Sequence, residues 1–124
     1  IFPNTSRFRS SLDWSNSYTG IAKFVRYSFL SKGNLDDVCY FYIATSNNGE
    51  FKYGVTVDIS ERKRLGNYRY IKCILKSTRL IVAELEYQIK LNLRSSSEYM
   101  DWKDVRKFMD SYKESIKFIK SVSD

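Results

Sequence analysis

The sequence predicts a small α/β protein in which helices flank a three-stranded antiparallel sheet. Two β-branched and aromatic segments, residues 38–45 and 51–56, are separated by the turn sequence Ser-Asn-Asn-Gly, which is typical of a hairpin. A third segment, residues 68–75, alternates in the manner of a strand, and apolar residues recur at three- and four-residue steps in other segments. A chain of 124 residues that is 43% hydrophobic can enclose one core.

The chain divides into an N-terminal extension, residues 1–36, and a main domain, residues 37–124. We expect the extension to be partly helical and to pack on the core. Its helix is predicted over residues 18–30, with one apolar side made of Ile21, Phe24, Val25 and Phe29. In the hairpin that follows, Gly54 lies inside the second strand, where a glycine marks a bulge or a close approach of another group.

Three helices and a strand are predicted after the hairpin. Asp58 and Glu61 fit a capping box that starts a short helix, and Gly66-Asn67 is a stop signal for it. After the strand of residues 68–75, Thr78 caps a helix that runs to about residue 93, and Asp101 caps the last helix. The buried stripes of these two helices are Ile81, Val82, Leu85 and Ile89, and then Val105, Phe108, Met109, Tyr112, Ile116 and Ile119.

The net charge of +7 is concentrated in one part of the chain. Residues 62–94 hold nine Lys or Arg and two Asp or Glu, whereas the basic and acidic residues on either side of this span cancel. Lys and Arg that replace the counterions of phosphates gain affinity for nucleic acid, so the segment predicts a polyanionic partner. A solvated basic face that serves solubility is the alternative.

The residue types that are missing exclude several kinds of site. The chain has no His, which excludes Ser-His-Asp triads, Cys-His dyads and His-based zinc sites. Cys39 and Cys73 stand alone in apolar stretches, which indicates unpaired thiols in a reducing compartment. We therefore expect an intracellular protein, in the cytoplasm of a host or bacterial cell or in a nucleus. The longest apolar runs fall far short of the roughly 20 residues of a membrane helix, so we expect no membrane partner.

Four elements of the sequence, in the right order, resemble the GIY-YIG endonuclease superfamily. Tyr40-Phe41-Tyr42-Ile43 stands where the first motif is expected, and Lys52-Tyr53-Gly54-Val55-Thr56 stands where the second is expected. Arg62 follows Gly54 by eight residues, as the motif Arg does, and Glu86 lies on a later predicted helix, where the family has its metal-binding Glu. Residues 98–102 are similar to an acidic and aromatic element in a branch common in phages and large DNA viruses.

The resemblance implies a divalent-metal-dependent endonuclease that hydrolyses DNA, encoded by a virus or mobile element, with RNA a less expected substrate. Glu86 would hold Mg²⁺ or Mn²⁺, and Arg62 would bridge the scissile phosphate and the nucleophile. Tyr42, favoured over Tyr40 because it aligns best against Gly54, would act as general base or position the water, with its phenol pKa lowered by nearby cations. The expected nucleic-acid contacts are Lys52, Thr56, Lys63, Arg64, Arg69 and Arg79.

The sequence departs from the family pattern at two positions. Lys52 stands where the second motif has Tyr, so Tyr53, a further catalytic candidate, is shifted by one residue, and such a shift turns a side chain to the other face of a strand. Tyr53 is then a core residue while Lys52 faces the site. Gly66 replaces the His that often follows the Arg by four residues. These changes leave a second reading open, a catalytically degenerate module that binds DNA or RNA without cutting it.

A third reading, a protein-interaction domain, treats the basic segment as incidental. Each of the main site residues could also have a purely structural role. Glu86 could form a helix-surface ion pair with Lys90, Tyr42 could be a core tyrosine, and Arg62 could be one of several solvated basic residues in a short helix. The sequence does not indicate an oligomeric state.

Overall fold

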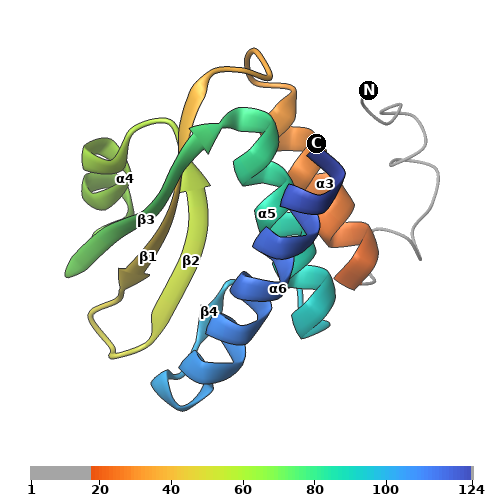
Figure 1. Ribbon diagram of the computed structural model, residues 1–124. Helices are drawn as coiled ribbons and strands as arrows, with labels where there is room; N and C mark the ends of the chain where they lie inside the picture. The colour runs from red at the N-terminus through yellow and green to blue at the C-terminus, as the bar shows by residue number, and fades with distance from the viewer. Residues whose placement is uncertain (1–17, 124) are drawn as a thin grey trace.

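The computed structural model describes residues 18–123 and shows an antiparallel sheet of four strands with three helices packed on one side (Figure 1). The strands lie in the order β3-β1-β2-β4. The elements in chain order are α3 (Tyr18–Leu30), β1 (Val38–Thr45), β2 (Phe51–Thr56), α4 (Ile59–Gly66), β3 (Tyr70–Thr78), α5 (Arg79–Leu93), β4 (Tyr99–Met100), the 3₁₀ helix η1 (Trp102–Asp104) and α6 (Val105–Ser123). The predicted α/β class with helices around an antiparallel sheet is confirmed.

The predicted hairpin of β1 and β2 is confirmed, and its register places Tyr42 opposite Gly54. Gly49 closes the turn with a φ of 89°, a conformation that glycine adopts without a steric penalty. Gly54 marks a close approach, because a Cβ built there would lie 2.7 Å from the hydroxyl oxygen of Tyr42. The register shift in this sheet lies elsewhere, between Phe41 and Tyr42 where β1 pairs with β3.

The prediction of three strands is wrong, because β4 adds a fourth that pairs with Phe51 and Lys52 of β2. A strand of two residues has no periodicity from which it could be recognised. The third strand is also displaced from residues 68–75, since β3 spans Tyr70–Thr78. The Tyr68 amide donates to the carbonyl of Lys63 and so belongs to the turn that ends α4, while β3 continues to Thr78 opposite Val38.

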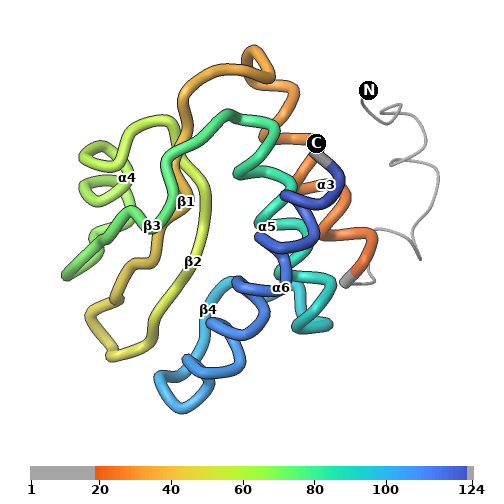
Figure 2. Tube along the Cα trace, viewed as in Figure 1, coloured from red at the N-terminus to blue at the C-terminus, as the bar shows by residue number. Residues whose placement is uncertain are grey.

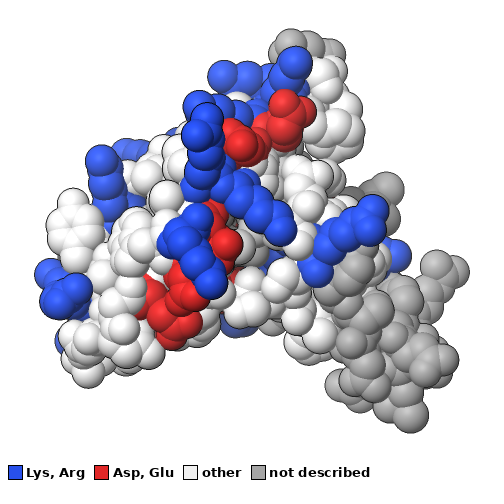
Figure 3. All heavy atoms as spheres, turned by 90° about the horizontal axis from the view of Figure 1, so that it is seen from below, with Lys and Arg blue, Asp and Glu red and all other residues white. Residues whose placement is uncertain are grey.

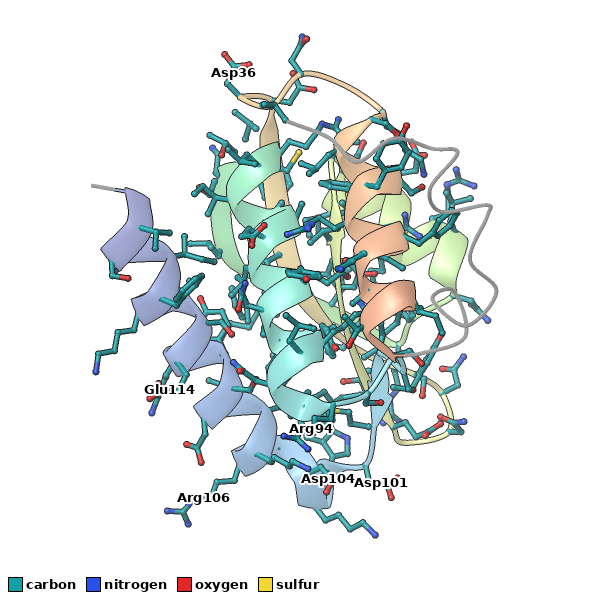
Figure 4. All side chains as sticks on the ribbon, turned by 90° about the vertical axis from the view of Figure 1, so that its right-hand side faces the viewer. Asp36, Arg94, Asp101, Asp104, Arg106 and Glu114 are labelled. Atoms are coloured by element: carbon teal, nitrogen blue, oxygen red, sulfur yellow. The ribbon has the colours of Figure 1, made fainter. Side chains whose placement is uncertain are left out.

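The helices form a layer in which α5 lies on the sheet between α3 and α6 (Figure 4). The tube view shows the same three helices on one side of the sheet and α4 on the other (Figure 2). Apolar residues of both strands of the hairpin pack against this layer, and the core cluster consists of Cys39, Phe41, Phe51, Tyr53, Val82, Leu85, Ile89, Leu93, Phe108 and Ile119. The predicted stripes of α5 and α6 are confirmed, because their remaining members pack against this cluster.

The helix predicted over residues 18–30 has those bounds and packs along α5, but Phe24 does not face the core as expected. Its side chain is 51% exposed, because the inward side of α3 is formed by Ala22 and Leu30, while Arg26 pairs with Glu84 of α5 at 3.0 Å. The rest of the predicted N-terminal extension, residues 1–17, lies outside the described residues. Within the described part of the chain, no helix is both long and apolar enough to span a bilayer.

Two of the three helix caps predicted from the sequence are present. The Glu61 amide donates to the Asp58 carboxylate at 3.0 Å, and the Ile81 amide donates to the Thr78 hydroxyl at 3.2 Å, so two predicted caps are confirmed. The Asp58 amide donates to the Thr56 hydroxyl at 3.2 Å, whereas in a capping box it would donate to the side chain of Glu61. Asp101 precedes η1 without a side-chain cap hydrogen bond, so its predicted capping role is wrong.

Candidate functional site

A pocket of about 210 Å³ lies beside β2, between α3 and α4, next to the part of β2 that β4 leaves unpaired. Its residues come from five elements, from the segment after α3 and from the segment before β4. Its lining consists of Phe24, Val25, Ser28, Phe29, Lys32, Tyr42, Lys52, Gly54, Val55, Arg62, Glu86 and Glu98. Four of the residues predicted from the sequence, Tyr42, Lys52, Arg62 and Glu86, therefore meet in one cavity. A second pocket of about 240 Å³ shares Phe29, Lys32 and Arg62 with it.

Tyr42 reaches the pocket because it lies on the sheet face opposite the core, above Gly54. Its side chain is 1% exposed. Burial raises the pKa of Tyr42 above its ordinary value, and Lys52 and Arg62 oppose that rise without reversing it. The expectation of a lowered pKa is therefore not met by the protein residues alone, and Tyr42 is a neutral phenol at neutral pH. Tyr40 lies two residues before Tyr42 on β1, pairs with Thr56 and does not line the pocket.

Lys52 and Tyr53 point to opposite faces of β2, as the shifted motif predicts. Tyr53 belongs to the core cluster, whereas the Lys52 ammonium lies in the pocket, where it donates to the Tyr68 hydroxyl at 3.1 Å. The same ammonium lies 3.5 Å from a carboxylate oxygen of Glu98. Burial alone would lower the pKa of Lys52, but the neighbouring Tyr42, Tyr68 and Glu98 oxygens outweigh it and raise that pKa. Lys52 is therefore a fixed cation in the pocket.

Arg62 enters the pocket from α4, the helix that Asp58 caps. Its Nε is buried and has no hydrogen-bond partner among the described residues. A buried N–H without an acceptor is costly unless a ligand or water supplies one, so this atom is available to an anion in the pocket. Thr56 contributes indirectly, because its hydroxyl donates to the Asp58 carbonyl at 3.1 Å and accepts from the Asp58 amide. Thr56 therefore shapes the turn that presents α4.

Glu86 and Glu98 form an acidic pair in the interior of the site. The Lys90 ammonium lies 2.7 Å from Glu98 Oε2 and 3.5 Å from Glu86 Oε2. Burial, with Glu98 adding to it, raises the pKa of Glu86 to about 8, while Lys90 partly opposes the rise. The pKa of Glu98 is lowered despite its burial, because Lys90, Glu86 and Lys52 favour its ionised form. Glu86 is the more buried of the two and lies farther from Lys90, so its ionised form is the less favoured of the two.

The ion pair of Glu86 with Lys90 that the sequence allowed does exist, but it is buried instead of lying on the helix surface. Glu98 was not among the predicted site residues. The only signal for it was the acidic and aromatic element at residues 98–102, which gives no hint that the Glu98 side chain turns back toward α5. Its backbone is held beside β2, because the Tyr53 amide donates to the Glu98 carbonyl at 3.2 Å.

The other predicted nucleic-acid contacts do not line the pocket. Lys63, Arg64 and Arg69 are exposed on α4 and on the turn after it. Arg79 is 5% exposed and is occupied within the fold, since it donates to the Phe29 carbonyl at 2.8 Å and pairs with Asp37 at 3.1 Å. We therefore remove Arg79 from the predicted nucleic-acid surface. Seen from below, acidic side chains lie among the basic ones, so this face of the protein is mixed in charge (Figure 3).

The acidic pair is the part of the site that could hold a metal ion. Among residues 18–123, no group of three or more Asp, Glu or Cys side chains is arranged to hold one. Two carboxylates are nevertheless a common protein share of a Mg²⁺ shell, which water and substrate oxygens complete. The buried Tyr53 hydroxyl near both carboxylates has no hydrogen-bond partner among the described residues, which indicates that a water or ligand completes it. The donor set therefore fits a hard divalent ion.

Comparison with known protein families, curated proteins and solved structures identified no relative of this chain. No protein-family model matches the sequence, and neither a curated protein nor a solved structure gives a significant match.

Proposed function

We propose that this protein is a divalent-metal-dependent endonuclease of the GIY-YIG type that hydrolyses DNA phosphodiester bonds. One observation carries the proposal, namely that Tyr42, Lys52, Arg62 and Glu86 come from four separate elements and line the same pocket. The register of Tyr42 against Gly54 supports it further, because it is the alignment for which the sequence favoured Tyr42 over Tyr40 as the motif tyrosine. The basic segment of residues 62–94, which begins at Arg62, suits a polyanionic substrate.

Arg62, Lys52 and Tyr42 would bind the scissile phosphate. The unpartnered Nε of Arg62 supports contact with a phosphate oxygen, since charge-assisted hydrogen bonds to phosphate are among the stronger ones in proteins. Lys52 adds a cation that is already ordered by Tyr68 and Glu98. Because Tyr42 keeps its proton, it would donate a hydrogen bond to the phosphate or the attacking water instead of accepting a proton as a general base.

Glu86, together with Glu98, would hold a Mg²⁺ or Mn²⁺ ion. Such an ion stabilises charge on the leaving oxygen and on the pentavalent phosphorus. The protein's own contribution is to keep two carboxylates beside the phosphate-binding side chains in a largely buried site.

The path of the DNA toward the pocket is supported by charge. Lys63 and Arg64 lie exposed on α4, the helix that presents Arg62, and Arg69 is exposed on the turn after it, so these three residues would contact phosphates on either side of the scissile one. The free Cys39 and Cys73 support an intracellular location for this activity.

A second candidate function, binding nucleic acid without cleaving it, is favoured by a specific observation. The Lys90 ammonium already neutralises the acidic pair, and Tyr42 cannot serve as a base at neutral pH. In that case the pocket would hold a phosphate on Arg62 and Lys52, with no ion beside it.

The test is a cleavage assay on supercoiled plasmid and on single-stranded DNA, with Mg²⁺, with Mn²⁺ or with EDTA. We expect nicking of at least one substrate that EDTA stops and that Arg62→Ala and Glu86→Gln each reduce by at least about 100-fold. Arg106→Ala is a matched control, because Arg106 is exposed and projects from α6 on the far side of α5 from the pocket (Figure 4). The proposal fails if wild type cuts neither substrate or if Glu86→Gln cuts as well as wild type.

A filter-binding titration with salt separates the second candidate from a protein without a nucleic-acid role. A binder without cleavage activity loses affinity steeply as salt rises, and Arg64→Ala lowers the slope by about one counterion. Affinity that is absent, or that hardly changes between low and high salt, contradicts both candidates.

A further inference from the structure

Lys90 holds an unusual position for a lysine, because its side chain is 1% exposed and its ammonium lies against both carboxylates of the acidic pair. The same ammonium lies 5.3 Å from the centre of the Tyr53 ring. A buried ammonium needs partners that replace its hydration, and Glu86, Glu98 and the ring face supply them. Lys90 is therefore tied to this acidic pair.

The pair in turn needs a cation. Two carboxylates that share a buried site repel each other unless a positive charge or a shared proton reduces the repulsion. The contact of 2.7 Å between the Lys90 ammonium and Glu98 is the shortest ion pair in the described part of the chain, which indicates that Lys90 supplies much of that charge. Lys52 reaches only the other oxygen of Glu98, at 3.5 Å.

Tyr53 provides an independent indication that the site takes a further group. Its side chain is completely buried, and its hydroxyl lies near Glu86 and Glu98 but forms no hydrogen bond with any described residue. Buried hydroxyls are seldom left in this state unless water or a ligand completes them. Both carboxylates also line the pocket, so a small hydrated ion has a route to them.

We propose that the Lys90 ammonium and a divalent cation compete for the same two carboxylates, Glu86 and Glu98. Lys90 holds the pair when no ion is bound, and a Mg²⁺ or Mn²⁺ ion enters by displacing the ammonium from Glu98. The inference rests on the metal-binding part of the proposed function and adds to it a second ligand, Glu98, and a built-in competitor. It follows that wild-type protein binds the ion more weakly than its two carboxylates alone would allow.

The test measures Mn²⁺ binding directly, without DNA, by the loss of the free-ion signal in electron paramagnetic resonance. Lys90→Met keeps the length of the side chain and removes its charge, and we expect it to bind Mn²⁺ at least tenfold more tightly than wild type. Glu98→Gln in the Lys90→Met background reverses that gain. Lys113→Met, at an exposed position on α6, serves as the matched control and binds as wild type does.

A second variant and a second measurement keep the test decisive if Lys90→Met folds poorly. Glu98→Gln in the wild-type background should weaken Mn²⁺ binding at least tenfold. Thermal melting adds a readout of competition, because Mn²⁺ should raise the melting temperature of Lys90→Met more than that of wild type. Equal Mn²⁺ affinity in wild type, Lys90→Met and Glu98→Gln overturns the inference.

These outcomes are distinguishable from a failure of the proposed function. A protein that binds Mn²⁺ in the expected order but leaves DNA intact supports the competition and refutes the nuclease. A protein that cuts DNA while its Mn²⁺ affinity ignores Lys90 and Glu98 supports the nuclease and refutes the competition.

Discussion

Gly54 determines where the Tyr42 ring can lie, and Gly54→Ala is the sharpest test of that arrangement. A methyl group at position 54 would lie 2.7 Å from the Tyr42 hydroxyl oxygen and 2.9 Å from the ring carbon that carries it. Favourable contacts between such atoms are about 3.5 Å or longer, so the ring must move by nearly 1 Å. It has little room to do so, because Tyr42 is buried against Tyr68, with the ring centres 6.3 Å apart.

Two opposing effects set the magnitude. Overpacking of a buried site costs about 1–3 kcal/mol. Replacing glycine by alanine also removes conformational freedom from the unfolded chain, which stabilises the fold by about 0.4–1 kcal/mol where the backbone conformation permits alanine. Gly54 has no left-handed φ, so that gain applies. We expect a net loss of about 1–2 kcal/mol, and a gain of up to 1 kcal/mol in a Tyr42→Leu background, where the clashing atoms are absent.

The assay is a double-mutant cycle measured by urea unfolding and circular dichroism. The coupling free energy between Gly54→Ala and Tyr42→Leu should be about 1–3 kcal/mol, because the overpacking exists only when the tyrosine ring is present. In the nuclease assay, Gly54→Ala should lower cleavage as strongly as Tyr42→Leu does, since both displace the same phenol. An equal cost of Gly54→Ala in the two backgrounds would refute the reasoning.

Three further predictions concern charged groups. Arg62→Lys should lower the cleavage rate by about 10- to 100-fold in single-turnover assays without changing the melting temperature, because lysine lacks the planar donor fork. Arg79→Met should lower the free energy of unfolding by about 2–3 kcal/mol in urea titrations, because Asp37 loses its cation and the Phe29 carbonyl loses its shorter hydrogen bond, so that each keeps only a backbone amide donor. The pKa of Glu86 is raised to about 8, so the folded state holds a proton that the unfolded chain releases near pH 4.5, and stability falls as pH rises between these values. Glu86→Gln has no such proton and therefore does not lose stability in this way. The free energy of unfolding of Glu86→Gln relative to that of wild type should grow by about 1 kcal/mol per pH unit from pH 5 to pH 8 in the same titrations. A difference between the two proteins that stays constant with pH contradicts the assignment.

The parts of the fold that the sequence predicted correctly are those governed by local rules. The turn at residues 46–49 fixes the length of the β1–β2 connection, and the turn length fixes the register, so the pairing of Tyr42 with Gly54 followed from the sequence. The opposite orientations of Lys52 and Tyr53 followed from the alternation of a strand. The helical stripes were visible because packing on one face requires spacing of three and four residues.

What could not be predicted depends on contacts between distant segments. Composition places Arg79 among the basic residues. Only the fold shows that its guanidinium pairs with Asp37 and donates a hydrogen bond to the Phe29 carbonyl near the end of α3. Glu98 lies in a polar loop with no pattern of its own, and its side chain becomes part of the site because β4 pairs with β2. The burial of Lys90 follows from that same pairing, since no helix-surface rule distinguishes it from an exposed i,i+4 partner of Glu86.

The charges of the pocket divide it into two ends. Tyr42, Lys52 and Arg62 each offer a hydrogen-bond donor at neutral pH, because burial raises the pKa of Tyr42 and neighbouring oxygens raise that of Lys52. Glu86 and Glu98 offer acceptors at the other end, and Lys52 joins the two ends through its contact with Glu98. A phosphodiester oxygen suits the first end and a cation the second, whereas a neutral ligand would leave the Arg62 guanidinium without an anion. This polarity favours an anionic substrate held beside a cation, and it makes Glu86, with a pKa of about 8, the group of the site whose protonation is most easily changed near neutral pH.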